Sequence, residues 1–174
     1  MRFKSPAAAV VFCLIISVSG CGTVKRATEP VYNGVKSVAE FADILEKYPN
    51  GVFSNRNGEQ MRTQILSFQF VIGNRIYFCT GSEKPLYEQL VKFPYVSYCT
   101  FPQDFEPVLS LNGKVVFTDD VALKERVFGG TGYASRFIIR HYQTPYNPNL
   151  KLFYIDVEEI ELYSNRGPEI YRTI

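Results

Sequence analysis

Short runs of β-forming residues, separated by turn signals, constrain the fold of this 174-residue chain more than any other feature. From about residue 51, apolar and β-branched residues alternate with polar ones, as in half-buried strands. Asn57-Gly58 and Gly73-Asn74 suit two-residue hairpin turns, because glycine readily enters the left-handed backbone region that such turns need. The pattern predicts six strands, near residues 51–56, 60–71, 75–80, 95–101, 106–118 and 151–164. Strands that follow one another directly favour an antiparallel sheet curled into a barrel over a parallel α/β fold.

Helical patterns lie before and between these strands. One face of an amphipathic helix is indicated by residues that recur at steps of three and four, namely Val35, Val38, Phe41, Ile44 and Leu45. Further helices are predicted over residues 84–93, 120–127 and 134–142. The last two are joined by Gly129-Gly130-Thr131-Gly132, which is either a mobile loop or simply two helix ends. The predicted class is therefore mainly β with peripheral helices (α+β).

The N-terminus has the proportions of an export signal. Arg2 and Lys4 precede the apolar run Ala7–Ile16, which is too short to span roughly 30 Å of bilayer at about 1.5 Å per residue. Val18-Ser19-Gly20-Cys21 follows and resembles the signal of bacterial lipoproteins, in which an aliphatic residue and two small residues precede the cysteine. The alternatives are an ordinary secretory signal with an incidental cysteine, or an uncleaved membrane-anchored segment.

The lipoprotein resemblance implies a division of the chain and a location. Residues 1–20 are the signal peptide, residues 21–33 are the lipidated cysteine and a tether, and residues 34–174 are the folded domain. Acyl chains on Cys21 would hold the protein on a membrane at about 0.8 kcal/mol per buried CH₂. Gly22 stands where an acidic residue commonly marks retention in the inner membrane. We therefore expect the bacterial cell envelope, facing the periplasm or the exterior, with the outer membrane preferred.

The charge balance argues against one class of partner. The formal net charge is +2, and Arg2 and Lys4 are the only charged residues before Cys21. The rest of the chain carries 17 basic and 17 acidic residues. Binding to phosphate backbones needs a surplus of positive charge on one face, so nucleic acid is not an expected partner.

The cysteines, the acidic pair and the histidine predict no metal centre and no nucleophilic triad. Four cysteines without a C-x-x-C motif exclude a zinc ribbon and a thioredoxin-type motif. Cys79 and Cys99 form a disulfide, which an exported compartment permits, or are small buried apolar residues. Asp119-Asp120 is interpreted as a strand end and helix cap, not as a metal site. The single histidine, His141, is expected to lie on the surface or at a helix end, and one histidine supports no catalytic triad.

A strand-to-helix turn carries groups that suit phosphate. Thr80-Gly81-Ser82-Glu83-Lys84-Pro85 supplies two hydroxyls, free amides at a helix start and an ammonium. The alternative is a plain helix cap. On the second predicted strand, one face is polar at one end and apolar along the rest, with Arg62, Gln64, Leu66, Phe68 and Phe70. This gradient suits a molecule with a charged tail and a flat apolar body, or is simply the solvated end of a core strand.

These segments, in this order, resemble the pyridoxamine 5′-phosphate oxidase-like split-barrel flavoproteins. The likeness covers roughly residues 35–170 and is carried by Gly58–Arg62, Ile76–Thr80, Gly81–Leu90, Phe93–Ser97, Asn112–Phe117, Asp120–Glu125 and Leu152–Ser164. It implies a six-stranded split barrel that forms a homodimer and binds FMN in clefts at the dimer interface. It also implies transfer of electrons or hydride with a small-molecule donor or acceptor.

The resemblance assigns the cofactor contacts residue by residue. Arg62 and Lys84 occupy the places of the phosphate-gripping cations, Thr80 and Ser82 match neighbouring phosphate and ribityl contacts, and Cys79 would lie close to the flavin. Three positions depart from the family pattern, because Gln64 and Ile65 replace an arginine and a proline and Glu83 replaces a basic residue. Each lost exposed contact costs on the order of 1 kcal/mol of phosphate affinity.

Two functions are therefore open at the level of sequence. The first is an envelope-anchored FMN flavoprotein, an oxidoreductase with an unidentified small substrate. The alternative is a non-enzymatic binding or assembly lipoprotein of the same fold that has lost the cofactor. Pyridoxamine phosphate oxidase activity itself is not expected, because Arg166 and Arg172 are isolated and form no second basic cluster for a substrate phosphate. A different planar cofactor such as haem lacks a suitable histidine beside Arg62 or Lys84.

Overall fold

The computed structural model describes residues 30–173, so the predicted signal peptide, Cys21 and most of the tether lie outside the described residues. The strands are β1 (Gly34–Val35), β2 (Asn50–Asn57), β3 (Gln60–Ser67), β4 (Phe70–Ile72), β5 (Arg75–Gly81), β6 (Tyr95–Thr100), β7 (Val108–Thr118), β8 (Leu150–Ser164) and β9 (Gly167–Arg172). The helices are the 3₁₀ helix η1 (Val38–Phe41) and the α-helices α1 (Ala42–Lys47), α2 (Pro85–Lys92), α3 (Val121–Phe128) and α4 (Tyr133–Tyr142). None of these helices has the length and apolar character that a membrane crossing requires.

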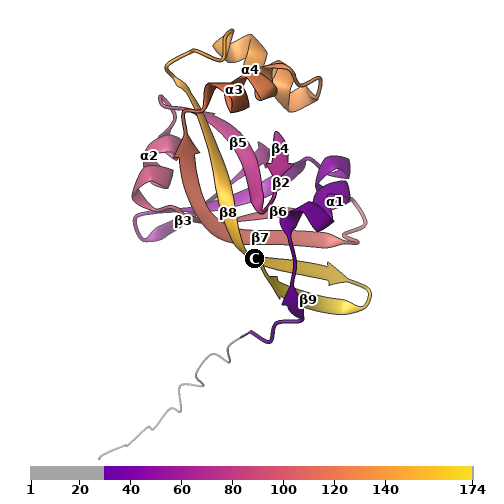
Figure 1. The fold of residues 1–174 in the computed structure, drawn as a ribbon. Helices are drawn as coiled ribbons and strands as arrows, with labels where there is room; N and C mark the ends of the chain where they lie inside the picture. Colours follow the sequence, from indigo (N-terminus) through magenta and orange to yellow (C-terminus); the bar gives the residue numbers. More distant parts are fainter. Residues whose placement is uncertain (1–29, 174) are drawn as a thin grey trace, which may run out of the picture.

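The six predicted strands are the six main strands of one curled sheet (Figure 1). Its order is β1-β9-β8-β7-β6-β2-β3, with β5 paired to β8 and β4 paired to β5. Gly58 and Gly73 have φ of 65° and 57°, which is the left-handed backbone that their turns require. The predicted strand over residues 60–71 is divided into β3 and β4, because Phe68 donates its N–H to Pro49 and Gln69 donates to Tyr77. Strand β9 and the short parallel pair β1–β9 are additions that the sequence did not indicate.

Strand β8 determines the open form of the barrel. One of its edges pairs with β7 from Leu152 to Tyr163, while the other pairs first with β5 and then with β9. The β7–β8 register shifts between Asn112 and Gly113, and a Cβ at Gly113 would overlap the backbone of Asp156. One long strand thus belongs to two ladders, and the sheet splits instead of closing. The predicted class, a mainly β split barrel with peripheral helices, is confirmed.

The first helix begins later than its periodicity predicts. Val35 lies in β1 and pairs with Arg172. Ser37 ends this strand with a capping box, in which its hydroxyl accepts from Ala39 N at 3.2 Å and its own N–H donates to Glu40 at 2.7 Å. Because this cap fixes the helix start, Val38 is the first residue of the helical segment. The other three helices lie within two residues of their predicted bounds.

Two apolar clusters lie on the two faces of the sheet. The inner cluster fills the barrel with large side chains such as Phe53, Phe78, Tyr98 and Phe153. The outer cluster lies between the β5–β8 pair and the helices α3 and α4, which cover one end of the barrel in Figure 1. The first described residues lie at the opposite end of the barrel, beside β9.

Candidate functional site

Thr80, the last but one residue of β5, places a hydroxyl on the inner face of the barrel. Its side chain is 2% exposed, and its Oγ1 has no hydrogen-bond partner within residues 30–173. Thr80 lies directly opposite Lys151 of β8, so both side chains share one face of the ladder. A buried hydroxyl without a partner costs free energy, and it marks a place where a ligand group would be satisfied.

Lys84 continues this region at the start of α2. It is the N-cap residue of the helix, but its side chain forms no capping hydrogen bond, and Pro85 occupies the first helical turn. Lys84 is half-buried, as is Lys151, whose ammonium lies 5.7 Å from the centre of the Tyr87 ring. Neither lysine forms an ion pair with a carboxylate in the described part of the chain. Lys84 and Lys151 thus belong to the same end of β5 and β8 as Thr80, and the Asp119 carboxyl, whose pKa Lys124 lowers, also interacts with Lys151.

Glu83 points away from this region. Its carboxylate accepts a hydrogen bond from Tyr142 Oη at 3.3 Å and lies 3.7 Å from His141 Nε2. It also covers Gly81, where a Cβ would overlap the carboxylate oxygens. The negative charge that departs from the family pattern is thus in contact with Tyr142 and His141 of α4.

Ser82 is already engaged within the fold. Its Oγ donates to Asn149 Oδ1 at 3.1 Å, and its N–H donates to the Asn149 carbonyl at 2.8 Å. These two bonds attach the β5–α2 turn to the segment that leads into β8. The structure assigns Ser82 a positioning role, which holds Thr80 and Lys84 in place.

The predicted residues of β3 lie on both faces of the strand. Arg62 and Gln64 lie on the inner face, because they pair with Asn55 and Phe53 of β2, whereas Ile65 lies on the outer face and is 67% exposed. Arg62 is exposed, donates to Gln60 at 3.1 Å and forms no ion pair among the described residues. Its guanidinium is free to meet an anion.

Gln64 belongs to a buried polar chain. It donates to Asn55 Oδ1 at 3.4 Å, and Asn55 donates to Gln89 Oε1 of α2 at 2.8 Å. Asn55 is fully buried, so this chain links β3 to α2 through β2. Gln64 thus has a structural partner in the position where the family pattern has an arginine.

Cys79 lies on the face opposite Thr80. It pairs with Leu152, packs in the outer cluster under α3 and α4, and burial raises the pKa of its thiol to about 12. Cys79 and Cys99 are both free, since β8 and β7 lie between their strands β5 and β6. The structure therefore contains no disulfide between these two cysteines, and both are partly buried small residues.

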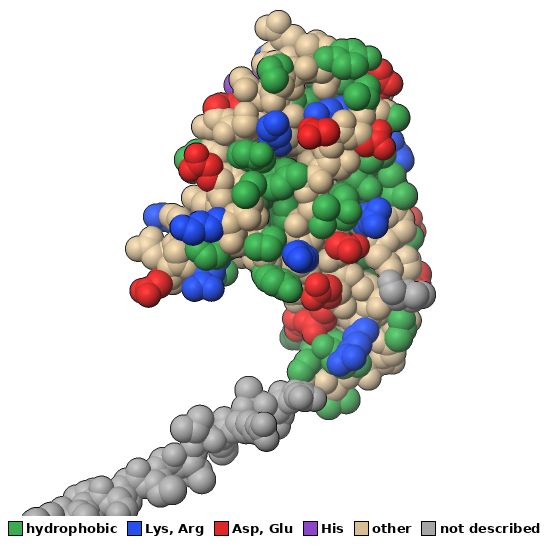
Figure 2. Space-filling view, turned by 60° about the vertical axis from the view of Figure 1, so that its left-hand side comes forward, with side chains coloured by type: hydrophobic (Ala, Val, Ile, Leu, Met, Phe, Trp, Pro, Cys, Tyr) green, Lys and Arg blue, Asp and Glu red, His purple; other side chains and the backbone are tan. Residues whose placement is uncertain are grey.

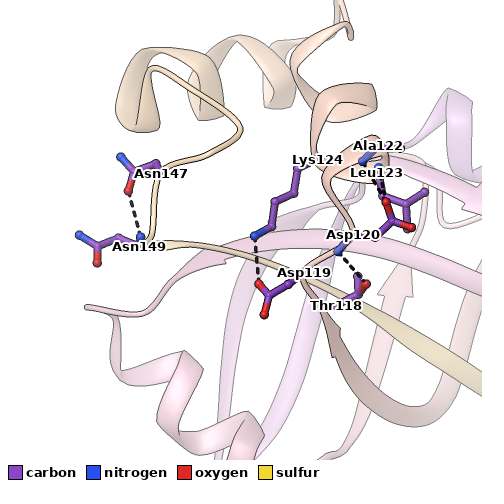
Figure 3. A network of polar contacts seen from close by, with 8 residues as sticks. All are labelled: Thr118, Asp119, Asp120, Ala122, Leu123, Lys124, Asn147 and Asn149. Carbon is purple, nitrogen blue, oxygen red and sulfur yellow. Dashed lines mark hydrogen bonds and ion pairs between the residues drawn. The ribbon is translucent and has the colours of Figure 1, made fainter.

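The Asp119-Asp120 pair behaves as a strand end and helix cap (Figure 3). Asp120 Oδ1 accepts from Ala122 N at 2.9 Å and from Leu123 N at 3.3 Å. Lys124 bonds to Asp119 at 3.0 Å and holds the pKa of that carboxyl below its usual range. No group of His, Cys, Asp and Glu side chains within residues 30–173 could hold a metal ion.

Sequence reasoning missed the residues that only strand pairing brings to the site. Lys151 is 71 positions away from Thr80 in the chain and directly opposite it in the sheet. Asn149, Asn55 and Gln89 position the turn and the helix, and each is an ordinary polar residue with no local signal. His141 also lies beside the site turn, through Glu83, although it is exposed as expected. These residues could not be found from the sequence, because the pairing register between β5 and β8 cannot be deduced from either strand alone.

The comparisons with known proteins support the same class of fold. The sequence matches no protein-family model, and no curated protein is similar enough to match it. Among solved structures, a NimC/NimA family protein from Clostridium acetobutylicum is 16% identical, with a TM-score of 0.66 over 76% of this chain and 91% of that chain. A pyridoxamine 5′-phosphate oxidase-related, FMN-binding protein from Nostoc punctiforme is 13% identical, with a TM-score of 0.57 over 77% and 88%.

A third solved structure is similar in fold, and its name states that the protein binds haem. The haem-binding protein from Mycobacterium smegmatis is 12% identical, with a TM-score of 0.60 over 79% of this chain and 58% of that chain. At these identities the likeness concerns the fold. The chain has the split-barrel fold of proteins related to pyridoxamine 5′-phosphate oxidase.

Proposed function

We propose that this protein is an FMN-binding flavoprotein of the bacterial envelope and an oxidoreductase for a small substrate. One observation carries the proposal, namely the buried hydroxyl of Thr80, which has no partner in residues 30–173 and lies opposite Lys151 at the turn that leads to Lys84. A phosphate group suits this place, because it offers acceptors to the hydroxyl and charge to the ammonium groups.

The residues present fit a flavin phosphate. Lys84, Lys151 and Arg62 would hold the phosphate, Thr80 would donate to it, and Ser82 would hold the turn through Asn149. When bound, FMN would supply electron and hydride transfer. Cys79 would contribute no nucleophile, since its thiol is buried on the other face and its pKa is about 12.

A homodimer belongs to the proposal because the outer face of the sheet suits a second copy. Met61 and Ile65 of β3 are each 67% exposed, and Tyr95 of β6 is 64% exposed. On the same outer face, Glu159 and Glu161 of β8 lie opposite Asn112 and Ser110, and no ion pair in the described chain neutralises them. Figure 2 shows apolar side chains over the middle of the side that bears the β2–β3 hairpin, with charged side chains around them. A two-fold pair would cover the apolar part.

The position of the tether supports a site that faces away from the membrane. Asn33 bonds to Ile170, so a chain anchored through Cys21 would enter the fold beside β9. Lys151 and Thr80 lie towards the other end of β8, ten residues from Glu161, the partner of Ile170, which is roughly 33 Å along the strand. A lipid on Cys21 in the outer membrane would thus leave the site accessible to soluble small molecules.

The visible spectrum of the purified protein tests the cofactor. We expect a yellow protein, or uptake of added FMN with quenching of flavin fluorescence. Lys84→Gln and Lys151→Gln should each weaken FMN binding about tenfold, because each removes a charge-assisted contact. Lys47→Gln, an exposed lysine of α1, is the matched control and should leave the affinity unchanged. A colourless protein that takes up no FMN at millimolar concentration would refute the proposal.

The second candidate function is a cofactor-free binding or assembly lipoprotein of the same fold. The buried chain Gln64–Asn55–Gln89 favours it, because Gln64 is engaged inside the protein and presents no cation. The same spectrum separates the two functions, since this candidate predicts no flavin absorbance and no change in affinity in the lysine variants. An intense Soret band would instead indicate haem.

A further inference from the structure

A second cleft lies away from the candidate flavin site. It has a volume of about 650 Å³ and is formed by α1, the start of β4 and the α3–α4 link. Neither Arg62, Thr80 nor Lys84 lines it. Its volume is within the range of small-molecule sites, and its walls come from segments far apart in the sequence. Such a cleft is therefore a separate place for a ligand.

Arg126 of α3 places a guanidinium group in the wall of this cleft. Its guanidinium lies 4.4 Å from the centre of the Phe70 ring, which also lines the cleft. Arg126 forms no ion pair within residues 30–173, although it is a fixed cation with five N–H donors. The contact with the Phe70 ring limits where the guanidinium can lie, and its N–H donors suit a planar, two-oxygen acceptor such as a carboxylate.

The floor of the cleft is apolar. Phe68, Phe70, Val71 and Val127 line it and belong to the buried or partly buried core. Phe68, Phe70 and Val127 are each 9% exposed or less, so they offer a ligand only a small apolar surface, worth about 25 cal/mol per Å² covered. The cleft therefore combines one oriented cation with an apolar floor.

The glycines of the α3–α4 link, which line the cleft, differ in whether the packing requires them. A Cβ at Gly130 would overlap Ser135 Oγ, so this glycine is required for packing. A Cβ at Gly132 would meet nothing within 4 Å, and its φ of −65° suits any residue. The fold does not require glycine at 132, and its missing side chain leaves the mouth of the cleft wide.

We propose that this cleft binds a small flat organic acid, with the carboxylate on Arg126 and the ring against Phe68 and Val71. Glu46 of α1 also lines the cleft and forms no ion pair with Arg126. A second negative charge on the ligand would be repelled by Glu46, so the site favours monocarboxylates over dicarboxylates.

Benzoate is a suitable probe, with benzyl alcohol as its uncharged counterpart. In NMR titrations of the purified protein, benzoate should shift the amide signals of residues 129–135 and Gln69 saturably at millimolar concentration, and benzyl alcohol and phthalate should bind at least about tenfold more weakly. Arg126→Gln should weaken benzoate binding about tenfold, while Arg136→Gln, which removes an exposed arginine of α4 outside this cleft, should not.

Equal binding of benzoate by Arg126→Gln and the unchanged protein, or shifts confined to the flavin-site turn, would overturn the proposal. Thermal unfolding of both arginine variants, measured in parallel, separates loss of the ligand site from loss of the fold. The titration needs no flavin, so a colourless protein that binds benzoate at residues 129–135 would support the cleft and refute only the flavin site.

Discussion

Cys79 and Thr80 are neighbours on β5, yet their side chains have opposite environments. Thr80 lies on the inner face, opposite Lys151, and its buried hydroxyl has no partner in the described chain. Cys79 lies on the outer face, opposite Leu152, where it packs against the apolar cluster under α3 and α4. The inner face at this end retains a hydroxyl that a ligand would satisfy, whereas on the outer face Tyr142 Oη donates to the Glu83 carboxylate.

The difference arises from what covers each face. The outer face is packed by Val127, Ile138 and Tyr142 of the two helices, which leave Cys79 only partly exposed. The inner face ends at the start of α2, where the apolar filling of the barrel gives way to Thr80 and the two lysines. A strand can thus belong to the core on one side and to a site on the other.

The largest expected effect is on the reactivity of Cys79. Burial raises the pKa of its thiol from 9.0 to about 12, so at pH 8 its thiolate, and hence its alkylation rate, should be about a thousandfold lower than in the unfolded chain. Peptide-resolved iodoacetamide labelling with and without urea measures this ratio. Rapid labelling of native Cys79 would show that α3 and α4 do not seal the outer face.

The same thiol predicts the direction of a pH effect on stability. The folded state holds the Cys79 proton more tightly than the unfolded state, so its contribution is complete below pH 9.0 and is lost as the pH rises towards 12. We expect the free energy of unfolding to fall less steeply between pH 9 and pH 12 in Cys79→Ala than in the unchanged protein.

The next largest effect is expected on the free energy of unfolding, when a side chain deep in the barrel is truncated. Phe78 is fully buried, and its ring stacks on Phe153 at a centroid distance of 5.5 Å. Phe78→Ala should lower the free energy of unfolding by about 3–5 kcal/mol in urea titrations, because it leaves a cavity in the barrel. A loss below about 1 kcal/mol would mean that the inner face is open along its whole length.

A smaller and more specific effect is expected at Thr80. Thr80→Val keeps the shape and removes the partnerless oxygen, so stability should be unchanged or rise by up to about 1 kcal/mol. FMN affinity should fall roughly three- to tenfold if the hydroxyl contacts the phosphate. The matched change on the other face, Cys79→Ser, should lower stability by about 1–3 kcal/mol and leave FMN affinity unaltered.

The smallest effect is expected at the edge of the outer cluster. Asp119 is 84% exposed in its ion pair with Lys124, so solvent screening limits the contribution of the pair. Asp119→Asn should cost at most about 1 kcal/mol, and the loss should vanish as the pH falls through the lowered pKa of the carboxyl. Urea titrations of both proteins at pH 7 and at pH 2.5 would measure this difference.

Much of the fold could be predicted from local pattern, but less of the site could. The strand runs, the turn glycines Gly58 and Gly73 and the cap at Asp120 all follow from residues within a few positions of one another. The turn Thr80–Lys84 was also visible locally, as a strand end followed by Pro85. The residues around this turn were not visible locally, since Lys151, which lies directly opposite Thr80, carries no local signal.

The sequence by itself determined the kind of elements and their order, because periodicity, backbone preference and capping act over short distances. The pairing of β5 with β8 was decided only in the tertiary structure. That pairing placed Lys151 beside Thr80, separated Cys79 from Cys99 and brought α4 against Glu83. Its physical reason is that strand register depends on apolar packing summed over the whole barrel, which no local segment of the chain contains.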